Sequence, residues 1–228
     1  MIMEKTGNIF TTKQQTIVNT INCVGVMGAG IAYEFRLREP KMYEKYQELC
    51  ITKSIDIGKL WIYKTEKQFV LNFPTKYDWK LPSKEEYLIK GLEKFVATYK
   101  QKGIKSIAFP LLGADKGGIS PTVSLNIMKK HLSLCDIDIE IWHFDASAKD
   151  DLYEDFINIF KDLDVDVIKE EAKIRVDIVR KIKKSLDDEN INSISGLLRT
   201  KGVGDKSLEK LFLYIKNYKI THKTLFDF

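Results

Sequence analysis

A glycine-rich turn between a predicted strand and a predicted helix constrains the fold of this chain most. Residues 20–32 read Thr-Ile-Asn-Cys-Val-Gly-Val-Met-Gly-Ala-Gly-Ile-Ala and follow a β-branched run at 16–18. Gly25, Gly28 and Gly30 permit positive φ angles and a close approach of a ligand to the backbone. The N–H groups that open the following helix would face a phosphate. A tight turn without any ligand is the alternative, because such a connection is a weak signal by itself.

Strand and helix patterns alternate through the first two thirds of the chain. Helices are expected between the strands: residues 31–50 with a break at Pro40, a helix capped by Ser83 with Glu86 three residues on, and a helix from Ser120-Pro121. This alternation predicts a three-layer α/β sandwich with ligand loops at the carboxyl ends of the strands. The expected strands, which are short and rich in β-branched and aromatic residues, are 16–21, 60–64, 69–73, 106–112 and 137–144.

Several separated motifs occur in a recognisable order. They are Gly7-Asn8-Ile9, Val26–Ala32, Asn72-Phe73-Pro74-Thr75-Lys76 followed by Trp79 and Lys80, and a second glycine loop at 112–118. Together they resemble the macrodomain family, which binds ADP-ribose, and within it the glycohydrolases, including the antitoxin-type DNA ADP-ribosyl glycohydrolases. The resemblance covers residues 1–145 and implies a three-layer α/β/α macrodomain with a mixed central sheet and hydrolase activity.

Lys76 is the expected catalytic nucleophile. It follows an apolar strand and Pro74, and a lysine at an apolar edge loses solvation, which favours the neutral, nucleophilic amine. In the glycohydrolases that the chain resembles, the matching lysine attacks C1″ of the distal ribose, and hydrolysis of the enzyme-bound ADP-ribosyl unit follows. An ordinary surface lysine is the alternative. Asp115 is the candidate acid, although the family's acid falls by counting on Gly117 and Asp115 stands where the family usually has glycine.

The remaining site residues are expected to hold ADP-ribose. The resemblance implies that Asn22 holds the distal ribose and that Asn8, in place of the family's usual aspartate, accepts from the adenine amino group. Asn8 is equally a good turn residue. The second glycine loop is expected to offer backbone donors to the diphosphate. The full predicted binding set is Asn8, Ile9, Asn22, Gly25, Val26, Met27, Gly28, Gly30, Ile31, Gly113, Ala114, Gly117, Gly118 and Ile119.

The last third of the chain has a different, helical pattern. After a boundary near 145, residues 149–163 and 165–186 are each predicted to be helical, so 146–189 is interpreted as a helical linker region. Residues 190–228 resemble a helix-hairpin-helix element, which binds the DNA backbone. Gly202 and Gly204 would expose N–H groups beside Lys201 and Lys206, and an ordinary helical turn is the alternative. Trp79 and Lys80 are further candidates for contact with nucleic acid.

Composition indicates the cellular location and the cofactors to be expected. The chain has 228 residues, 44% hydrophobic and 30% charged, with a formal net charge of +5. It shows no membrane-length apolar run and no secretory leader pattern. Its three cysteines lack the spacing of metal ligands and are expected to be free thiols. We therefore expect a cytoplasmic protein that needs no metal or other cofactor.

Three functions are compatible with these observations. The first is a hydrolase that removes ADP-ribose from nucleic acid, most specifically from a DNA base, as an antitoxin or repair activity. The second keeps the site but acts on ADP-ribose esters of proteins or on O-acetyl-ADP-ribose. The third is a non-catalytic ADP-ribose-binding module, or an antitoxin that binds its cognate ADP-ribosyltransferase toxin directly.

Overall fold

The computed structural model describes residues 1–223, and of residues 195, 199 and 219–223 it describes the backbone alone. The chain divides into two compact units, one of residues 1–145 and one that begins at Ala146. The elements of the first unit are β1 (Ile2–Gly7), η1 (Ile9–Thr11), β2 (Thr16–Asn22), α1 (Gly30–Arg38), α2 (Pro40–Ile51), β3 (Trp61–Lys64), β4 (Phe69–Lys76), α3 (Glu85–Thr98), β5 (Ser106–Pro110), η2 (Asp115–Gly117), α4 (Pro121–Leu132) and β6 (Asp138–Phe144).

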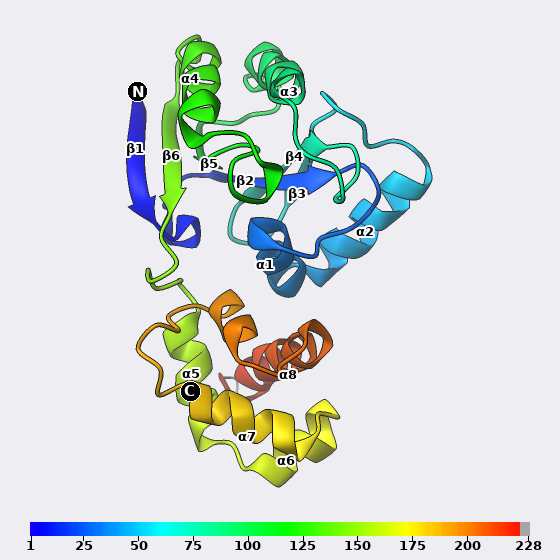
Figure 1. The fold of residues 1–228 in the computed structure, drawn as a ribbon, viewed down its shortest axis with the longest axis vertical. Helices are drawn as coiled ribbons and strands as arrows, with labels where there is room; N and C mark the ends of the chain where they lie inside the picture. Colours follow the sequence, from blue (N-terminus) through cyan, green and yellow to red (C-terminus); the bar gives the residue numbers. More distant parts are fainter. Residues whose placement is uncertain (224–228) are drawn as a thin grey trace. The chain divides into compact units, whose positions relative to one another are not determined.

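The first unit is a mixed six-stranded sheet with helices on both faces. The strand order is β1-β6-β5-β2-β4-β3, and all neighbouring pairs are parallel except the antiparallel pair of β3 and β4. Helices α3 and α4 cover one face of the sheet, and α1 and α2 cover the other (Figure 1). The expected three-layer α/β/α architecture is confirmed. Because five strands run the same way, their carboxyl ends meet at one edge of the sheet, where ligands of such folds bind.

Each face of the sheet buries its own apolar cluster. One joins the β strands to α3 and α4 around Phe73, Leu92 and Phe109. The other joins them to η1, α1 and α2 around Met27 and Tyr46. Strands β2 and β5 are buried on both faces, as expected for the centre of a parallel sheet.

Three local predictions differ from the structure. Strand β1 was not expected, because Glu4 and Lys5 interrupt its apolar pattern at the edge of the sheet. Strand β4 runs past Pro74 to Lys76, where the ladder to β2 shifts register. The prediction that Ser83 caps α3 is wrong: the helix begins at Glu85, and Ser83 instead donates its N–H to the carbonyl of Gly117 at 2.9 Å.

A buried carboxylate joins β1 and η1 to β6. Glu140 is 3% exposed, and its oxygens accept from the Lys5 ammonium (2.6 Å), the Thr12 hydroxyl (2.6 Å) and the Trp142 indole (2.8 Å). Burial acts to raise the pKa of Glu140, but the hydrogen bonds from Lys5, Thr12, Gln14 and Trp142 outweigh it, and the net pKa lies below the ordinary value. The charged form is therefore the stabilised one.

Replacing Glu140 with glutamine should lower the free energy of unfolding by about 2 kcal/mol at neutral pH, since charge-assisted bonds to a buried group are lost. Because the folded-state pKa is lowered, this contribution is present at neutral pH and is lost as the pH falls through the folded pKa. Urea unfolding from pH 7 down to acid should therefore show a smaller acid loss for the variant than for wild type. Parallel pH profiles of the two proteins would contradict this role.

The second unit contains helices α5 (Tyr153–Asp162), α6 (Val165–Ala172), α7 (Val176–Ser185), the short η3 (Ser195–Arg199) and α8 (Asp205–Lys223). Helices α5 and α6, which lie in the predicted linker region, contact α8 within this unit. The last five residues of the predicted 190–228 element lie outside the described residues.

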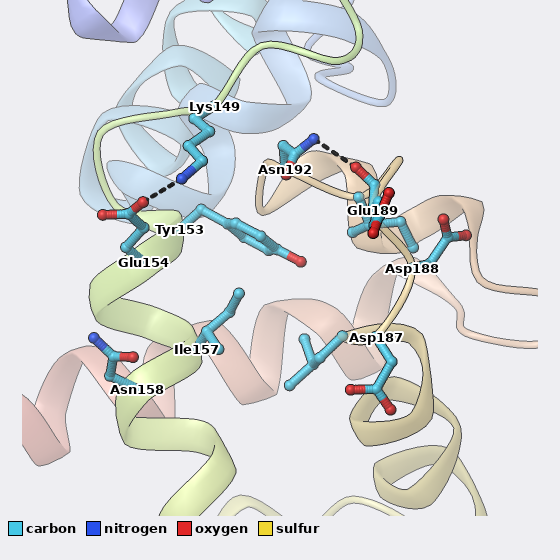
Figure 2. Close-up of a pocket in the computed structure, with 11 residues that line it drawn as sticks. Lys149, Tyr153, Glu154, Ile157, Asn158, Asp187, Asp188, Glu189 and Asn192 are labelled. Carbon is cyan, nitrogen blue, oxygen red and sulfur yellow. Dashed lines mark hydrogen bonds and ion pairs between the residues drawn. The ribbon is translucent and has the colours of Figure 1, made fainter.

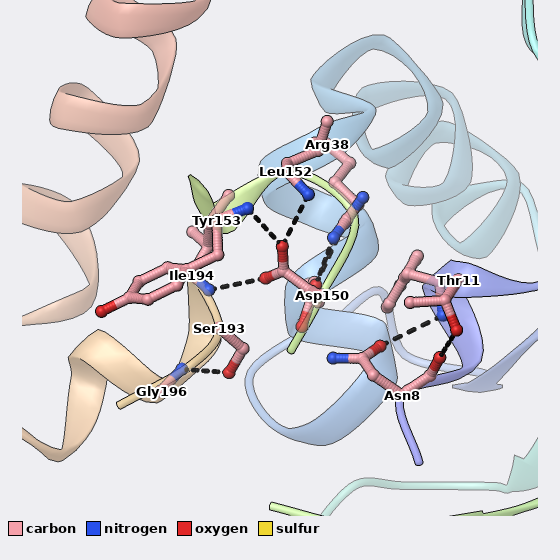
Figure 3. A network of polar contacts seen from close by, with 11 residues as sticks. Asn8, Thr11, Arg38, Asp150, Leu152, Tyr153, Ser193, Ile194 and Gly196 are labelled. Atoms are coloured by element: carbon pink, nitrogen blue, oxygen red, sulfur yellow. Dashed lines mark hydrogen bonds and ion pairs between the residues drawn. The ribbon is translucent and has the colours of Figure 1, made fainter. Parts of the chain in front are cut away.

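Two polar details set the helix boundaries of this unit. Asp150 accepts from the N–H groups of Leu152 and Tyr153, at 2.7 and 2.6 Å, so α5 begins at Tyr153 rather than at Lys149 (Figure 3). Its second oxygen accepts from the N–H of Ile194 at 2.7 Å. The predicted single helix over 165–186 is wrong, because Lys173 adopts φ +53° and separates α6 from α7. Among the described residues, no helix has both the length and the apolar character to span a membrane.

Candidate active site

Three predicted functional segments leave adjacent strands at the same edge of the sheet. Asn22 ends β2 and lies opposite Lys76, which ends β4. The second glycine loop follows β5, the other neighbour of β2. Cys23 reinforces this junction, because its N–H donates to the Tyr77 carbonyl at 2.9 Å and its thiol contacts the Lys76 carbonyl at 3.5 Å. The strand order therefore brings Lys76 next to the start of the first glycine loop, and the second glycine loop begins one strand further along the same edge.

The Lys76 amine lies against the second glycine loop. Its Nζ donates to the carbonyl of Lys116 at 2.5 Å. The strand behind it is buried from Val70 to Thr75, whereas the Lys76 side chain is only partly buried. Asp115 is exposed at the start of η2, one residue before that carbonyl, and among the described residues no ion pair joins it to Lys76. The chain thus holds the amine in place but does not by itself exclude water from it.

Asn22 organises the first glycine loop. Its Nδ2 donates to the Val26 carbonyl at 2.5 Å, and its Oδ1 accepts from the N–H groups of Val24 and Val26 and from the Tyr46 hydroxyl at 3.0 Å. Both ends of the amide are therefore engaged inside the loop, which differs from the ribose contact that the family resemblance implies. Burial raises the pKa of the Tyr46 phenol far above its usual value, so it remains a donor. No local motif indicates this role for Tyr46.

The glycines of the first loop provide the positive φ angles and the exposed backbone that were expected of them. Gly25 and Gly30 have φ +83° and +57°, and Gly28 and Gly30 are exposed where α1 begins. The Met27 side chain is fully buried in the cluster beneath, so it anchors the loop and only its backbone can meet a ligand. The first turn of α1, which includes Ile31, presents the unpaired N–H groups that every helix start has.

The second glycine loop is more closed than expected. The N–H groups of Ala114, Gly117, Gly118 and Ile119 all donate to carbonyls at Leu111, Gly113 or Ala114. Four of the five predicted backbone donors are therefore engaged within the loop, because it forms a compact turn around η2. Ser83, which sequence reasoning assigned to a helix cap, packs beneath this loop with its hydroxyl buried and, among the described residues, without a hydrogen-bond partner.

Asn8 acts as a turn residue at the same edge of the sheet. Its Oδ1 accepts from the N–H of Phe10 at 3.1 Å, and its carbonyl accepts from Thr11 (Figure 3). Ile9 is buried with Met27 and Ala32 in one cluster, which connects η1 to the first glycine loop. Of the two interpretations of Asn8, the turn is the one seen directly.

An exposed aromatic segment directly follows Lys76. Tyr77 and Trp79 are 53% and 51% exposed, and the Lys80 ammonium lies 5.4 Å from the centre of the Trp79 ring. Asp78 fixes the turn by accepting from the N–H of Lys80 at 2.9 Å. Aromatic rings with adjacent cations offer a stacking surface for bases.

The predicted hairpin in the second unit connects η3 to α8. Gly202 has φ +84°, Val203 is buried, and Gly204 precedes α8. Lys201 and Lys206 are exposed, and the Lys181 amine lies within 3.0 Å of where a Gly202 side chain would begin. The turn is thus surrounded by ammonium groups.

Within the described part of the chain, no cluster of three or more His, Cys, Asp or Glu residues is arranged for a metal ion. Cys23, Cys50 and Cys135 are all free thiols.

Comparison with known proteins decides the family. The Macro domain family model matches residues 18–128. The solved macrodomain of Mycobacterium tuberculosis DarG is 34% identical, with a TM-score of 0.60, and the match covers 62% of this chain and 97% of that one. This chain belongs to the macrodomain family. The macrodomain of Thermus aquaticus DarG has a TM-score of 0.60 at 30% identity, with 63% of this chain and 98% of that chain covered.

Curated macrodomain relatives are longer than this chain. The DNA ADP-ribosyl glycohydrolase of M. tuberculosis is 35% identical over 147 residues, which are 62% of this chain and 42% of the relative. A DNA ADP-ribosyl transferase–DNA ADP-ribosyl glycohydrolase fusion protein of Thermosipho africanus is 32% identical over 155 residues, 60% of this chain and 40% of the relative. The chain therefore spans about two fifths of the length of these relatives.

Proposed function

We propose that this macrodomain protein removes ADP-ribose from modified DNA through nucleophilic attack by Lys76. The observation that carries the proposal is the contact of Lys76 with both glycine loops: its amine donates to the Lys116 carbonyl of the second loop, and its backbone pairs with Asn22 at the start of the first. Macrodomain relatives at 32–35% identity that bear the name DNA ADP-ribosyl glycohydrolase support the reaction, and a solved T. africanus DarTG in complex with ADP-ribose supports the ligand.

The proposed chemistry has two steps. The neutral Lys76 amine forms a bond to C1″ of the distal ribose, while the bond from C1″ to the DNA base breaks and its electron pair leaves with the base. The lysine nitrogen loses a proton, and the base gains one from solvent. Water then attacks C1″ and loses a proton, while the bond from C1″ to the lysine nitrogen breaks. The nitrogen keeps that electron pair and regains a proton from solvent, and ADP-ribose is released. Asp115, next to the loop carbonyl that holds Lys76, is proposed to accept a proton in the second step.

The partial exposure of Lys76 fits a site that the substrate completes. A nucleotide sugar bound at the glycine loops would cover the amine and exclude water from it. The first loop, held by Asn22 and Tyr46, would offer the N–H groups of α1 to the diphosphate. The second loop would border the bound ligand, and the hydrogen bond from the Ile119 N–H to the Gly113 carbonyl would hold that loop closed.

The direct test is release of ADP-ribose from ADP-ribosylated single-stranded DNA by the full chain, compared with release from a protein bearing ADP-ribose esters and from O-acetyl-ADP-ribose. We expect the DNA conjugate to be the best substrate. Faster turnover of the esters would assign the site to protein or small-molecule substrates. Tight ADP-ribose binding without turnover of any conjugate would make the protein a reader.

Trp79 is proposed to stack on a base of the substrate. Substitution of Trp79 by alanine should raise KM for the DNA conjugate by about tenfold, since one base–aromatic stack is worth ~1–3 kcal/mol. Phenylalanine at the same position should retain most of the affinity. Because Trp79 is half exposed, thermal stability and affinity for free ADP-ribose should not change. Equal KM values for the alanine variant and wild type would exclude the stacking role.

The hairpin of the second unit is proposed to contact DNA phosphates through Lys201, Gly202, Gly204 and Lys206. Alanine at Lys201 or Lys206 should lower the slope of log affinity against log salt by about 1 for each lysine, without any change in sequence preference. Lys161→Ala, on an exposed end of α5, is the matched control. Unchanged slopes for both hairpin variants would leave the ordinary helical turn as the explanation and favour a protein partner, such as a transferase, for this unit.

A further inference from the structure

The second unit contains a pocket whose lining residues have no part in the proposed active site or in the proposed DNA contacts. It has a volume of about 450 Å³ and lies between α5 and the segment that follows α7. Glu154, Asp187, Asp188 and Glu189 contribute four carboxylates to its wall, against the single ammonium of Lys149. That ammonium already pairs with Glu154 at 2.5 Å. The wall therefore retains an excess of negative charge.

Tyr153 is the second, independent feature of this pocket. The residue is 3% exposed, and its ring extends from α5 toward the 187–189 segment (Figure 2). Among the described residues, its buried hydroxyl has no hydrogen-bond partner. A buried hydroxyl without a partner costs free energy in the folded state, so a polar group that enters the pocket would be favoured there.

The protonation state of the Tyr153 hydroxyl also favours a polar ligand in the pocket. Burial, together with the charges of Asp150 and Asp188, raises the pKa of Tyr153 to about 12. The phenol thus stays protonated at neutral pH and can accept a hydrogen bond from a cation while it donates to a carboxylate.

Part of the pocket wall is apolar. Ile157, Leu186 and Ile191 line it together with the Tyr153 ring. Such a surface fits an aliphatic stem, and an aromatic face attracts an organic cation. A bare divalent cation would instead require oxygen ligands around it and would gain nothing from apolar contacts.

We propose that this pocket binds an aliphatic cation, with an ammonium or guanidinium group held by the Asp187 and Glu189 carboxylates and the Tyr153 hydroxyl, and with its stem on the isoleucine and leucine side chains. A free polyamine and an arginine side chain of a polypeptide both have this chemistry.

Calorimetry on the full chain at low ionic strength tests the proposal with spermidine, agmatine and a peptide that carries one arginine. Binding should weaken about tenfold in the Asp187→Asn/Glu189→Gln variant and severalfold in Tyr153→Phe. Tyr153→Phe should not lower thermal stability, because the hydroxyl that it removes has no internal partner. Asp162→Asn/Asp166→Asn, an equal loss of charge outside the pocket, should bind as wild type does.

Comparison of the three probes also identifies the source of the cation. Binding of free spermidine or agmatine indicates a small molecule, and binding of the peptide alone indicates a polypeptide side chain. No binding of any probe up to about 10 mM overturns the proposal. Equal weakening in the control variant, or binding of Mg²⁺ alone with the same dependence on Asp187 and Glu189, overturns it as well.

Discussion

Replacement of Lys76 by alanine is expected to abolish release of ADP-ribose from modified single-stranded DNA, by about a thousandfold or more, with the fold retained. The reason is that the proposed mechanism has no other nucleophile at C1″. Lys76→Arg should be equally inactive, since a guanidinium stays protonated and cannot attack. Affinity for free ADP-ribose, measured by calorimetry, should change little, because the proposed site holds the diphosphate with the glycine loops and not with the amine.

Lys105→Ala is the matched control for this prediction. Lys105 is an exposed lysine that precedes β5, at the opposite edge of the sheet from the glycine loops. The control should release ADP-ribose at the wild-type rate. Release by Lys76→Ala at the rate of the control would contradict the assigned role of Lys76, even if the wild-type protein proves to be an active hydrolase.

Substitution of Gly117 by alanine should have the second large effect, on ADP-ribose binding. An alanine Cβ at this position would lie 2.6 Å from the Ser83 hydroxyl oxygen and 3.2 Å from its Cβ. The Ser83 hydroxyl can rotate away, but the Ser83 Cβ cannot follow easily, because the Ser83 N–H is bonded to the Gly117 carbonyl and holds the two backbones together. We expect a loss of about 1–3 kcal/mol of stability and at least a tenfold loss in ADP-ribose affinity, measured by thermal unfolding and calorimetry.

A second substitution makes the cause of this loss testable. Ser83→Gly removes both contacting atoms, so the Ser83→Gly/Gly117→Ala double variant should recover most of the affinity. Gly103→Ala is the backbone control, since Gly103 has φ +70° with open space around it and lies away from the loop. It should cost stability through strain alone and leave affinity unchanged. Failure of the double variant to recover would show that the clash with Ser83 is not the cause.

Periodicity and turn chemistry predicted the layers of the fold well. The central strands are buried on both faces. Pro40 separates α1 from α2 because proline starts a helix more easily than it continues one. Strand β1 escaped prediction because its stabilising contact, between Lys5 and Glu140, joins residues 135 positions apart. Lys173, which divides α6 from α7, has a backbone conformation that few side chains reveal in advance.

The individual site residues could be predicted from the sequence better than the contacts among them. The glycines and Lys76 were identified from local motifs, and pairing of β2 with β4 brings them together. The engagement of Asn22 by Tyr46 and the packing of Ser83 under the second loop depend on tertiary contacts that no local pattern contains. The closed second loop likewise follows from hydrogen bonds among its own residues, which a glycine-rich pattern does not specify.

The most direct test of the central claim is a crystal structure of this protein with ADP-ribose bound. The account predicts the diphosphate between the two glycine loops, with C1″ of the distal ribose about 3–3.5 Å from the Lys76 nitrogen and in line for attack. A distal ribose far from Lys76, with the amine directed to bulk water, would contradict the account and leave only a binding pocket.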